Sequence, residues 1–325
     1  MNRFTVIRYA FLGIPVFIGI APPVAAQQDY PVKPIRLIIG FAAGGTTDIV
    51  GRLIAQRISD VVRQQVVIEN RPGAAANIAM EMAAKAAPDG YALYLASPAY
   101  VINPSLYAKV PYRVEDFAPV SLNVTTPMVL IVTNAFPAKS AQEFIQNARA
   151  NPDKYNYGTA GSGSSSHLAA ALFLSVTNTR LTHVPYKSGP AVVTDLIAGQ
   201  LNMMTYPVPE VAPYIKAGKM RALGVSAMKR SAVLPEVPTL HEEGVTGFTV
   251  MNWFGVTAPA RTPREIIAKL NAAIQRGFAT PQSRERIAEL GLDLVNSSPD
   301  DFGAFIREEY EKWGKVIRTQ GINAD

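Results

Sequence analysis

Apolar and polar positions in the first third of the chain predict strands that alternate with helices. The apolar run at 35–39 predicts a strand, and the helical spacing of apolar residues over 49–58 predicts a helix. Strands over 66–69 and 91–96, on either side of a helix over 76–86, continue the alternation. Strands that alternate with helices predict a parallel sheet with helices on its faces.

The rest of the chain repeats this pattern and predicts two lobes. Predicted strands are 118–123, 127–133, 155–158, 201–205 and 221–226, and predicted helices are 140–150, 191–198, 209–216 and 299–317. We place the first crossing between lobes at 124–126 and the second around Trp253. The segment 103–117, rich in prolines and aromatics, is left without a helix or strand. About 299 mature residues exceed the usual single core, which favours two domains.

The N-terminus has the pattern of a secretory signal peptide. Arg3 and Arg8 precede an almost wholly apolar run, which is shorter than the ~20 residues of a spanning helix and is broken by Pro22 and Pro23. Small residues up to Ala26 suit cleavage there, so we expect an exported periplasmic protein. The chain has no cysteine, which excludes disulfides and a lipidated N-terminal cysteine.

Charge and histidine placement exclude several functions. Removal of the signal peptide lowers the formal net charge from +6 to +4, and no basic run with interleaved aromatics indicates nucleic acid. Three histidines, at His167, His183 and His241, have no recognisable metal spacing. We therefore expect no nucleic acid partner, no metal and no cofactor, although a mildly basic surface favours small anions.

A glycine turn at 41–48 follows the first strand and leads into the first helix. The first N–H groups of a helix lack internal partners, and the positive end of its dipole attracts anions. Gly44 and Gly45 let a ligand approach the backbone, while Thr47 and Asp48 are types that cap a helix or orient its neighbours. Phe41 offers an apolar wall. An ordinary connection between a strand and a helix is the alternative interpretation.

A second turn of this kind, at 159–165, is rich in hydroxyl groups. It lies between a short strand and a helix, and its serines can donate hydrogen bonds to a carboxylate. The alternatives are a flexible linker and a serine nucleophile. No Gly-x-Ser-x-Gly motif includes any of these serines, which argues against a hydrolase, and His167 is interpreted as a structural or ligand-contacting donor.

Motifs along the whole mature chain resemble the Bug family, the extracytoplasmic solute receptors of tripartite tricarboxylate transporters. These motifs are Pro34–Ile39, Ala43-Gly44-Gly45-x-x-Asp48, Glu69–Gly73, Pro88–Tyr91, Asn103–Tyr107, Tyr157–Ser164, His183–Lys187, Gly218–Leu223 and Pro235–Leu240. The resemblance implies an α/β, two-lobed type II periplasmic-binding-protein (Venus flytrap) fold, each lobe a mainly parallel sheet flanked by helices. The expected division is a signal peptide at 1–26, a first lobe at 27–124 and 253–325, and a second lobe at 125–252.

The resemblance also implies a ligand site and partners. The expected ligand-binding residues are Phe41, Ala43, Gly44, Gly45, Thr47, Asp48, Ser97, Ser162, Ser164, Ser165, His167, Thr205 and Tyr206. They would close on a small organic carboxylate, which a monomeric receptor would deliver to the integral-membrane subunits of the transporter. Many relatives have an aspartate where this chain has Thr205 and Tyr206, so a plain or aromatic carboxylate is favoured over an amino acid.

Two other functions compete with the receptor. A secreted serine hydrolase would use Ser162 or Ser164, and the effector domain of a regulator would have a related fold. The signal peptide and the absence of a DNA-binding segment oppose the regulator.

Overall fold

A computed structural model describes Met1 and residues 30–322 of the chain. The chain divides into the units Met1–Tyr30 and Pro31–Asp325, and everything below concerns the second unit. The predicted signal peptide and its cleavage site near Ala26 lie outside the described residues. Within the described part, no helix has both the length and the apolar content that a membrane span needs.

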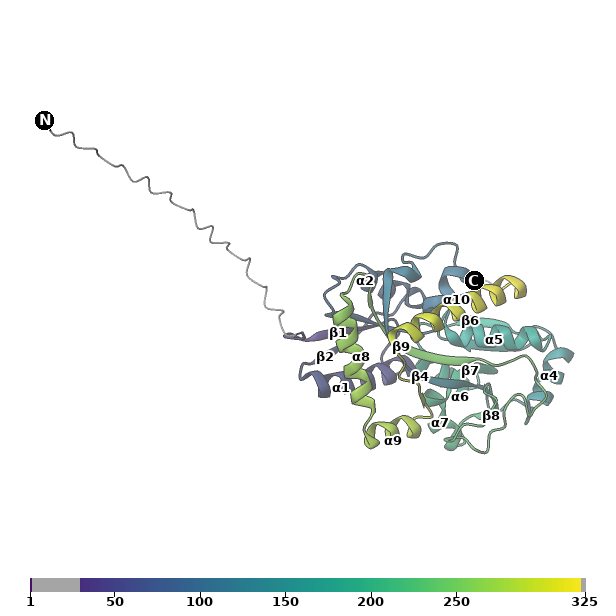
Figure 1. Ribbon diagram of the computed structural model, residues 1–325. Coiled ribbons are helices and arrows are strands. Elements are labelled where there is room, and N and C mark those ends of the chain that lie inside the picture. Colours follow the sequence, from purple (N-terminus) through teal and green to yellow (C-terminus); the bar gives the residue numbers. More distant parts are fainter. Residues whose placement is uncertain (2–29, 323–325) are drawn as a thin grey trace. The chain divides into compact units, whose positions relative to one another are not determined.

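Strands and helices alternate through most of the described chain (Figure 1). The strands are β1 (Ile35–Ile39), β2 (Val66–Asn70), β3 (Ala92–Ala96), β4 (Phe117–Val132), β5 (Asn156–Thr159), β6 (Thr182–Pro185), β7 (Met203–Pro207), β8 (Arg221–Val225), β9 (Met251–Pro259) and β10 (Asp293–Leu294). The α-helices are α1 (Thr46–Val62), α2 (Asn77–Ala84), α3 (Ala99–Leu106), α4 (Ala141–Ala150), α5 (Ser165–Val176), α6 (Gly189–Ile197), α7 (Val208–Lys216), α8 (Arg264–Phe278), α9 (Pro281–Glu289) and α10 (Pro299–Gln320). Short 3₁₀ turns cover Ala74–Ala76 and Val114–Asp116.

The strands form one mixed sheet with the order β2-β1-β3-β9-β4-β7-β5-β6, while β8 and β10 pair with β4. β1 pairs in parallel with β2 and β3, and β5 pairs in parallel with β6 and β7. The middle of the sheet is antiparallel. Each lobe is thus a largely parallel α/β unit, and the long strands β4 and β9 join the two.

β4 corrects the prediction of two strands separated at 124–126. It runs unbroken for 16 residues. Thr125 lies opposite Trp253 on β9 and opposite Asp293 on β10, so strands on both sides hold the middle of β4 in extended form. Register shifts at 119–121 and 122–124 absorb the local irregularity as bulges. Both predicted crossings therefore lie side by side in one ladder.

The helix α3 was missed by the sequence analysis, because prolines and aromatics made 103–117 look irregular. Pro104 lies inside this short helix, most of whose other residues are buried. Asn103 is fully buried and donates to the carbonyl oxygen of Ala75 at 2.9 Å, which ties the helix to the neighbouring turn. Tertiary contacts have outweighed the local preference of proline.

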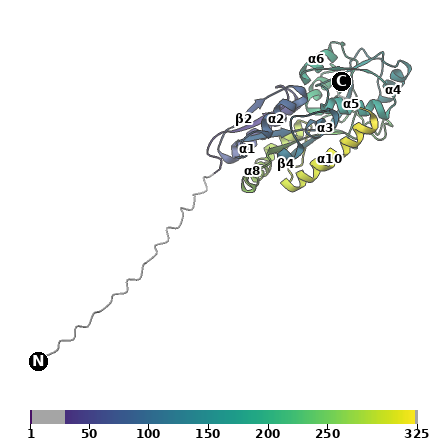
Figure 2. The ribbon, with the colours of Figure 1, turned by 90° about the horizontal axis from the view of Figure 1, so that it is seen from above.

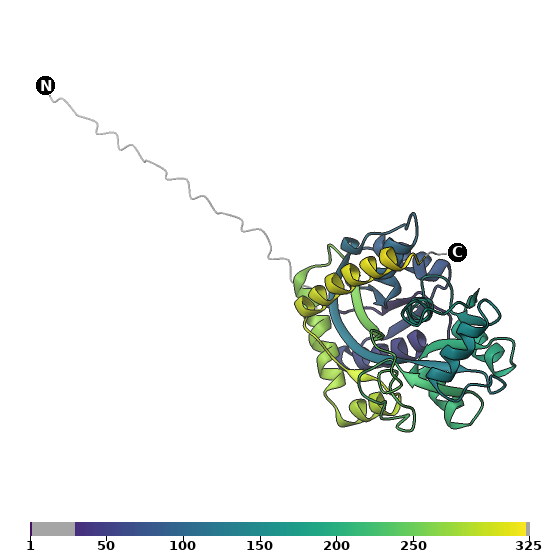
Figure 3. The same cartoon turned by 90° about the vertical axis from the view of Figure 1, so that its right-hand side faces the viewer.

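The C-terminal helix α10 packs against elements of both halves of the sheet. It contacts α3 and β4, and it also contacts α5 (Figures 2 and 3). Trp253 on β9 is fully buried, and its Nε1 donates to Oε2 of Glu309 on α10 at 3.2 Å. Trp253 is thus a packing residue of the crossing strands, one of the two roles that its position suggested.

Candidate functional site

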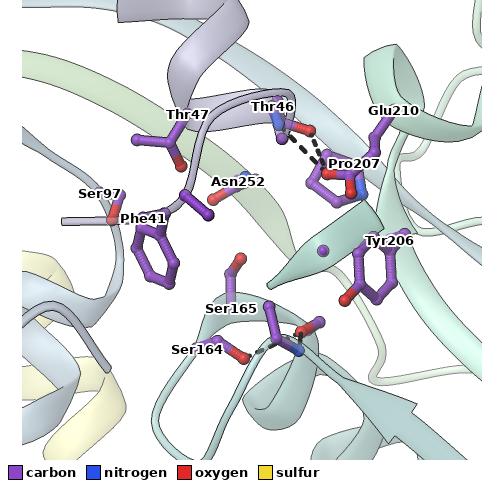
Figure 4. A pocket seen from close by; sticks show the side chains of 15 residues that line it. Phe41, Thr46, Thr47, Ser97, Ser164, Ser165, Tyr206, Pro207, Glu210 and Asn252 are labelled. Carbon is purple, nitrogen blue, oxygen red and sulfur yellow. Dashed lines mark hydrogen bonds between the residues drawn. The ribbon is translucent and has the colours of Figure 1, made fainter. Parts of the chain in front are cut away.

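The N-termini of α1 and α5 border one small cavity of about 40 Å³ (Figure 4). A space of this size holds about two or three water molecules or one small polar head group. Its walls are formed by Phe41, Ala42, Gly45, Thr46, Thr47, Ser97, Ala160, Ser164, Ser165, Ser166, Gly189, Tyr206, Pro207, Glu210 and Asn252. The two glycine-bearing turns that the sequence singled out, one from each lobe, therefore meet at one site.

In the first turn, Gly44 rather than Gly45 needs to be glycine. Gly44 has φ +87°, in the left-handed region, whereas Gly45 has φ −85° and serves as the N-cap of α1. A Cβ at Gly45 would lie 3.7 Å from Oε2 of Glu210, an ordinary contact. Gly45 lines the cavity and Gly44 shapes the turn beside it.

The carboxylate of Asp48 holds this turn in place. Oδ2 accepts from the backbone N of Gly44 at 3.1 Å and from Nε of Arg52 at 2.9 Å, while Oδ1 accepts from Nδ2 of Asn70 at 3.1 Å. Burial alone would raise the pKa of Asp48, but these hydrogen bonds outweigh it and hold the pKa below its ordinary value. Asp48 therefore stabilises the turn through these hydrogen bonds, and it does not line the cavity.

In the second turn, Ser164 caps the helix and Ser165 faces the cavity. Oγ of Ser164 accepts from the backbone N of His167 at 3.3 Å and donates to the carbonyl oxygen of Gly161 at 2.7 Å. The hydroxyl of Ser165 points into the space between the two helix starts (Figure 4). Ser164 therefore positions the N-terminal turn of α5.

His167 lies away from the cavity. Its ring stacks on His183 with centroids 4.4 Å apart, and its Nδ1 accepts from the backbone N of Gly163 at 3.2 Å. It lines a different cavity, which also includes Arg180. Ser164 and His167 are thus hydrogen-bonded to the backbone of their own loop, at Gly161 and Gly163, and they do not form a nucleophile–base pair.

Glu210, which the sequence analysis did not select, reaches the cavity from the first turn of α7. Its Oε2 accepts from the backbone N of Thr46 at 3.1 Å and from Oγ1 of Thr46 at 3.1 Å. A residue from one predicted lobe thereby caps a helix of the other. Burial raises the pKa of Glu210 to about 7, although the two hydrogen bonds from Thr46 oppose the shift.

Two further polar side chains complete the cavity wall. Tyr206 is 1% exposed and Asn252 is 3% exposed. Within the described residues, the hydroxyl of Tyr206 and Oδ1 of Asn252 have no hydrogen-bond partner of normal geometry. Thr205 is turned the other way, since its Oγ1 donates to the carbonyl oxygen of Ser166 at 2.9 Å. Tyr206, on the predicted site strand, therefore faces the cavity and Thr205 supports the loop behind it.

A larger cavity of about 460 Å³ adjoins the small one, since both are lined by Phe41, Ala42 and Ala160. Ser162 lines the larger cavity, as do Tyr107 and Lys187. One of its walls is the turn at 74–76, in which three successive alanines have positive φ. Such backbone strain in non-glycine residues is common beside ligand sites.

The structure thus separates the predicted site residues into three groups. Seven line the small cavity: Phe41, Gly45, Thr47, Ser97, Ser164, Ser165 and Tyr206. Ser162 lines the larger cavity. The remaining five, Ala43, Gly44, Asp48, His167 and Thr205, line neither cavity, and the hydrogen bonds of Asp48, His167 and Thr205 support the two turns.

Thr46, Glu210 and Asn252 are lining residues that the sequence analysis did not select. Thr46 lies within the glycine turn at 41–48, so its place at the start of α1 was a usable signal. Glu210 and Asn252 gave no local signal, because pairing of distant strands brings them to the site.

Comparison with known proteins settles the family. Residues 50–322 match the tripartite tricarboxylate transporter family receptor, TctC. The chain belongs to this family. BugT of Bordetella pertussis is 36% identical over 307 residues, which cover 93% of this chain and 94% of BugT. A protein encoded in the tcbD-tcbE intergenic region of Pseudomonas sp. (strain P51) is 37% identical over 321 residues, which cover 98% of this chain and 96% of that protein.

Solved structures of TctC-type receptors share the fold. The periplasmic binding protein BugD superposes with a TM-score of 0.86 at 32% identity, covering 90% of this chain and 99% of BugD. A protein of R. palustris solved with adipate gives a TM-score of 0.88 at 35% identity, covering 91% of this chain and 99% of that one. MatC from Rhodopseudomonas palustris, with bound malate, gives 0.84 at 33% identity, covering 89% and 100%.

These relatives confirm the predicted Bug-type, two-lobed periplasmic-binding-protein fold. They are solute-binding receptors, so this TctC-family chain is a solute-binding protein and not an enzyme. The secreted hydrolase is thereby set aside.

Proposed function

We propose that this TctC-family protein captures a small organic carboxylate in the cavity between the N-termini of α1 and α5. The observation that carries the proposal is the meeting of two helix starts, one from each lobe, at one cavity lined by several hydroxyl groups. The N-terminal N–H groups and dipoles of both helices favour an anion there. Relatives of the same fold were solved with adipate and with malate, which are both carboxylates.

Thr47 and Ser165 are the proposed direct donors to the carboxylate. Both line the cavity in the first turn of their helices, and Thr46 is already engaged with Glu210. Ser97 adds a third hydroxyl in the wall, and Phe41 supplies an apolar surface shared by both cavities. The carboxylate is thus recognised by hydroxyls and backbone N–H groups, without a cationic side chain among the residues that line the small cavity.

The remaining predicted site residues hold these donors in place. Asp48 and Gly44 fix the first turn, Ser164 and His167 fix the second, and Thr205 supports the second from behind. Ala43 lies in the first turn and Ser162 lies in the second. We propose that both residues approach the ligand when the two turns move together.

We also propose that ligand binding closes the lobes about β4 and β9. For this proposal we keep the predicted lobe boundaries, 27–124 with 253–325 for the first lobe and 125–252 for the second. Thr125 and Trp253 are opposed in the antiparallel ladder, so both crossings share one hinge region. Hinge closure needs few residues to change φ and ψ, and the bulge at 122–124 offers a place for that change. Small-angle scattering with and without a saturating ligand tests the closure, since an unchanged radius of gyration refutes it.

We propose delivery to the integral-membrane subunits of a tripartite tricarboxylate transporter, which the match to the receptor family of these transporters supports. We propose that the mature protein acts in the periplasm as a monomer after cleavage near Ala26. Mass spectrometry of protein from the periplasmic fraction tests the cleavage, and light scattering tests the oligomeric state. Uptake of the radiolabelled ligand by cells that lack the receptor, with and without complementation, tests delivery.

A thermal-shift screen followed by calorimetry tests the carboxylate proposal. The screen contains mono-, di- and tricarboxylates, aromatic acids and their uncharged amides. We expect at least one acid, and not its amide, to bind. Thr47→Val and Ser165→Ala should each weaken binding by about tenfold to a hundredfold, since a hydrogen bond to a charged group contributes about 1.5–3 kcal/mol. Thr319→Val, exposed on α10, is the matched control and should bind like the parent. Equal affinity of acid and amide refutes the proposal.

A further inference from the structure

Three buried polar atoms in the wall of the small cavity lack a hydrogen-bond partner of normal geometry among the described residues, although the Tyr206 hydroxyl also interacts with the side chain of Ser166. They are Oε1 of Glu210, Oδ1 of Asn252 and the hydroxyl of Tyr206. Two of them are acceptors when Glu210 is ionised, and the third can accept as well as donate. A buried acceptor without a donor is costly, so a cavity that gathers three such atoms is suited to a ligand group that donates several hydrogen bonds.

Thr46 and Gly189 together determine the position of the Glu210 carboxylate. Its Oε2 takes both donors of Thr46, which fixes the carboxylate and turns Oε1 away from that residue. A Cβ added at Gly189 would overlap Oε1, so the glycine at the start of α6 gives the carboxylate its room. Two contacts from different elements therefore hold a single acidic group at the edge of the cavity.

No positive side chain in the described part of the cavity wall balances this acid. Glu210 and Tyr206 are the titratable residues of the wall, and neither Lys, Arg nor His lines it. The nearby acid Asp48 is bonded to Gly44, Arg52 and Asn70, and so it is already compensated. Burial raises the pKa of Glu210 to about 7, which is the behaviour of a carboxylate that lacks a cation.

We propose that Glu210, with Asn252 and Tyr206, forms a subsite for a ligand ammonium group, and that the ligand is an amino-carboxylate. This inference rests on the proposed carboxylate receptor and names its ligand class. An ammonium group brings three donors and one positive charge, which match the unpartnered atoms and the unbalanced acid. The sequence analysis disfavoured an amino acid because Thr205 and Tyr206 stand where many relatives have an aspartate; in this proposal Glu210 on α7 supplies the acid instead.

The remaining parts of such a ligand also have places in the structure. The backbone N–H of Thr46 donates to Glu210 and is not available to a ligand. We therefore expect the ligand carboxylate to accept hydrogen bonds from Thr47 and from Ser165 at the start of α5. The small cavity, at about 40 Å³, suits the polar head group. The adjoining cavity of about 460 Å³ has mainly apolar walls, among them Phe41, Pro72 and Tyr107, and it suits the side chain.

Calorimetry with matched pairs of ligands tests the proposal. The probes are leucine with 4-methylpentanoate, phenylalanine with 3-phenylpropanoate and glutamate with glutarate, where each pair differs by the amino group. The 2-hydroxy analogue of leucine tests a neutral donor. We expect at least one amino acid to bind about tenfold or more tighter than its partner without nitrogen. Binding of that amino acid at pH 6 should release protons, measured in two buffers of different ionisation enthalpy, because the ammonium favours ionised Glu210.

Variants separate the subsite from the carboxylate site. Glu210→Gln should weaken binding of the amino acid by about tenfold to a hundredfold, abolish the proton release, and change affinity for the partner without nitrogen by less than about threefold. Gly189→Ala, which displaces the carboxylate, should act in the same direction. Glu236→Gln, an exposed site in the same lobe, is the matched control and should leave both affinities unchanged. Circular dichroism confirms that each variant is folded.

The outcomes distinguish failure of this inference from failure of the proposed function. If acids without nitrogen bind the parent more tightly and Glu210→Gln strengthens them, the ammonium subsite is refuted while the carboxylate receptor stands. An equal loss for the hydroxy acid and the amino acid in Glu210→Gln also refutes the ammonium assignment. If no carboxylate with or without nitrogen binds at all, the proposed function itself is wrong.

Discussion

Replacement of Asp48 by alanine tests whether this residue supports the site or touches the ligand. The resemblance to the Bug family placed Asp48 among ligand-binding residues, whereas its carboxylate is bonded to Gly44, Arg52 and Asn70. A scaffold residue affects the stability of the ligand-free protein. A residue that acts by contacting the ligand affects affinity and leaves that stability nearly unchanged.

The size of the expected loss follows from these three bonds. The bonds from Gly44 and Asn70 are made to a carboxylate whose side chain is 5% exposed, and each such bond contributes about 1.5–3 kcal/mol. The side chain of Arg52 is 57% exposed, so its ion pair adds at most about 1 kcal/mol. Water that enters the emptied site offsets part of the loss, so we expect Asp48→Ala to lower the free energy of unfolding by about 3 kcal/mol. Asp48→Asn keeps one acceptor and should lose about half as much.

Urea unfolding of the ligand-free protein at pH 7 provides the measurement. Asp60→Ala is the matched control, because Asp60 lies on the same helix and makes only exposed contacts with Arg57 and Gln56. It should cost less than about 1 kcal/mol. The pKa of Asp48 is lowered in the folded protein, so its contribution is present above its unfolded pKa and is lost as the pH falls through the folded pKa.

A different pattern would refute this reasoning. If Asp48→Ala unfolds at the same urea concentration as the parent yet loses ligand affinity, the carboxylate acts on the ligand and the three bonds are not what holds the turn. If the stability difference between Asp48→Ala and the parent does not shrink as the pH is lowered toward 3, the carboxylate form is not the stabilising one.

Three further predictions concern the turn, the buried acid and the contact between lobes. Gly44→Ala should lower the free energy of unfolding in urea by about 1–2 kcal/mol, because alanine is strained at the φ of +87° found there. Gly45→Ala, at φ −85°, should lower it by less than about 1 kcal/mol. Equal losses contradict the assignment of Gly44 as the strained position. The pKa of Glu210 is raised to about 7, so its neutral form favours the folded state. The free energy of unfolding of the ligand-free parent should therefore fall by up to about 3 kcal/mol between pH 4.5 and 7. For Glu210→Gln, the free energy of unfolding should change less over this pH range. Tyr107→Phe removes the hydroxyl that donates to the carbonyl oxygen of Ser162 across the lobes, and should weaken ligand binding by about two- to tenfold in calorimetry; unchanged affinity means that this contact plays no part in closure.

The sequence by itself determined the regular part of the fold. The apolar run of β1, the helical spacing within α1 and the glycine turn between them are local patterns, and the structure has all three in the predicted places. The second turn before α5 was equally visible, because hydroxyl and glycine residues between a strand and a helix are read from adjacent positions. These signals sufficed to predict two lobes and the turn, one in each lobe, that borders the cavity.

Long-range pairing decided what local patterns did not. The middle of β4 was predicted as a break, yet β9 and β10 on either side hold it extended. The helix α3 contains a proline and still forms, because burial of Asn103 and its neighbours outweighs the local cost. In both cases the deciding partners lie far away along the chain.

The composition of the site shows the same limit most clearly. Thr47 and Ser165 were found because they begin helices after recognisable turns. Glu210 and Asn252 were not, since α7 and β9 reach the cavity only through the strand order β9-β4-β7. Nothing in the residues around Glu210 distinguishes it from an exposed helical carboxylate; its burial, its bonds to Thr46 and its raised pKa arise from the meeting of two lobes. The sequence therefore predicted the two turns that border the cavity, and the tertiary structure decided which acid stands beside them.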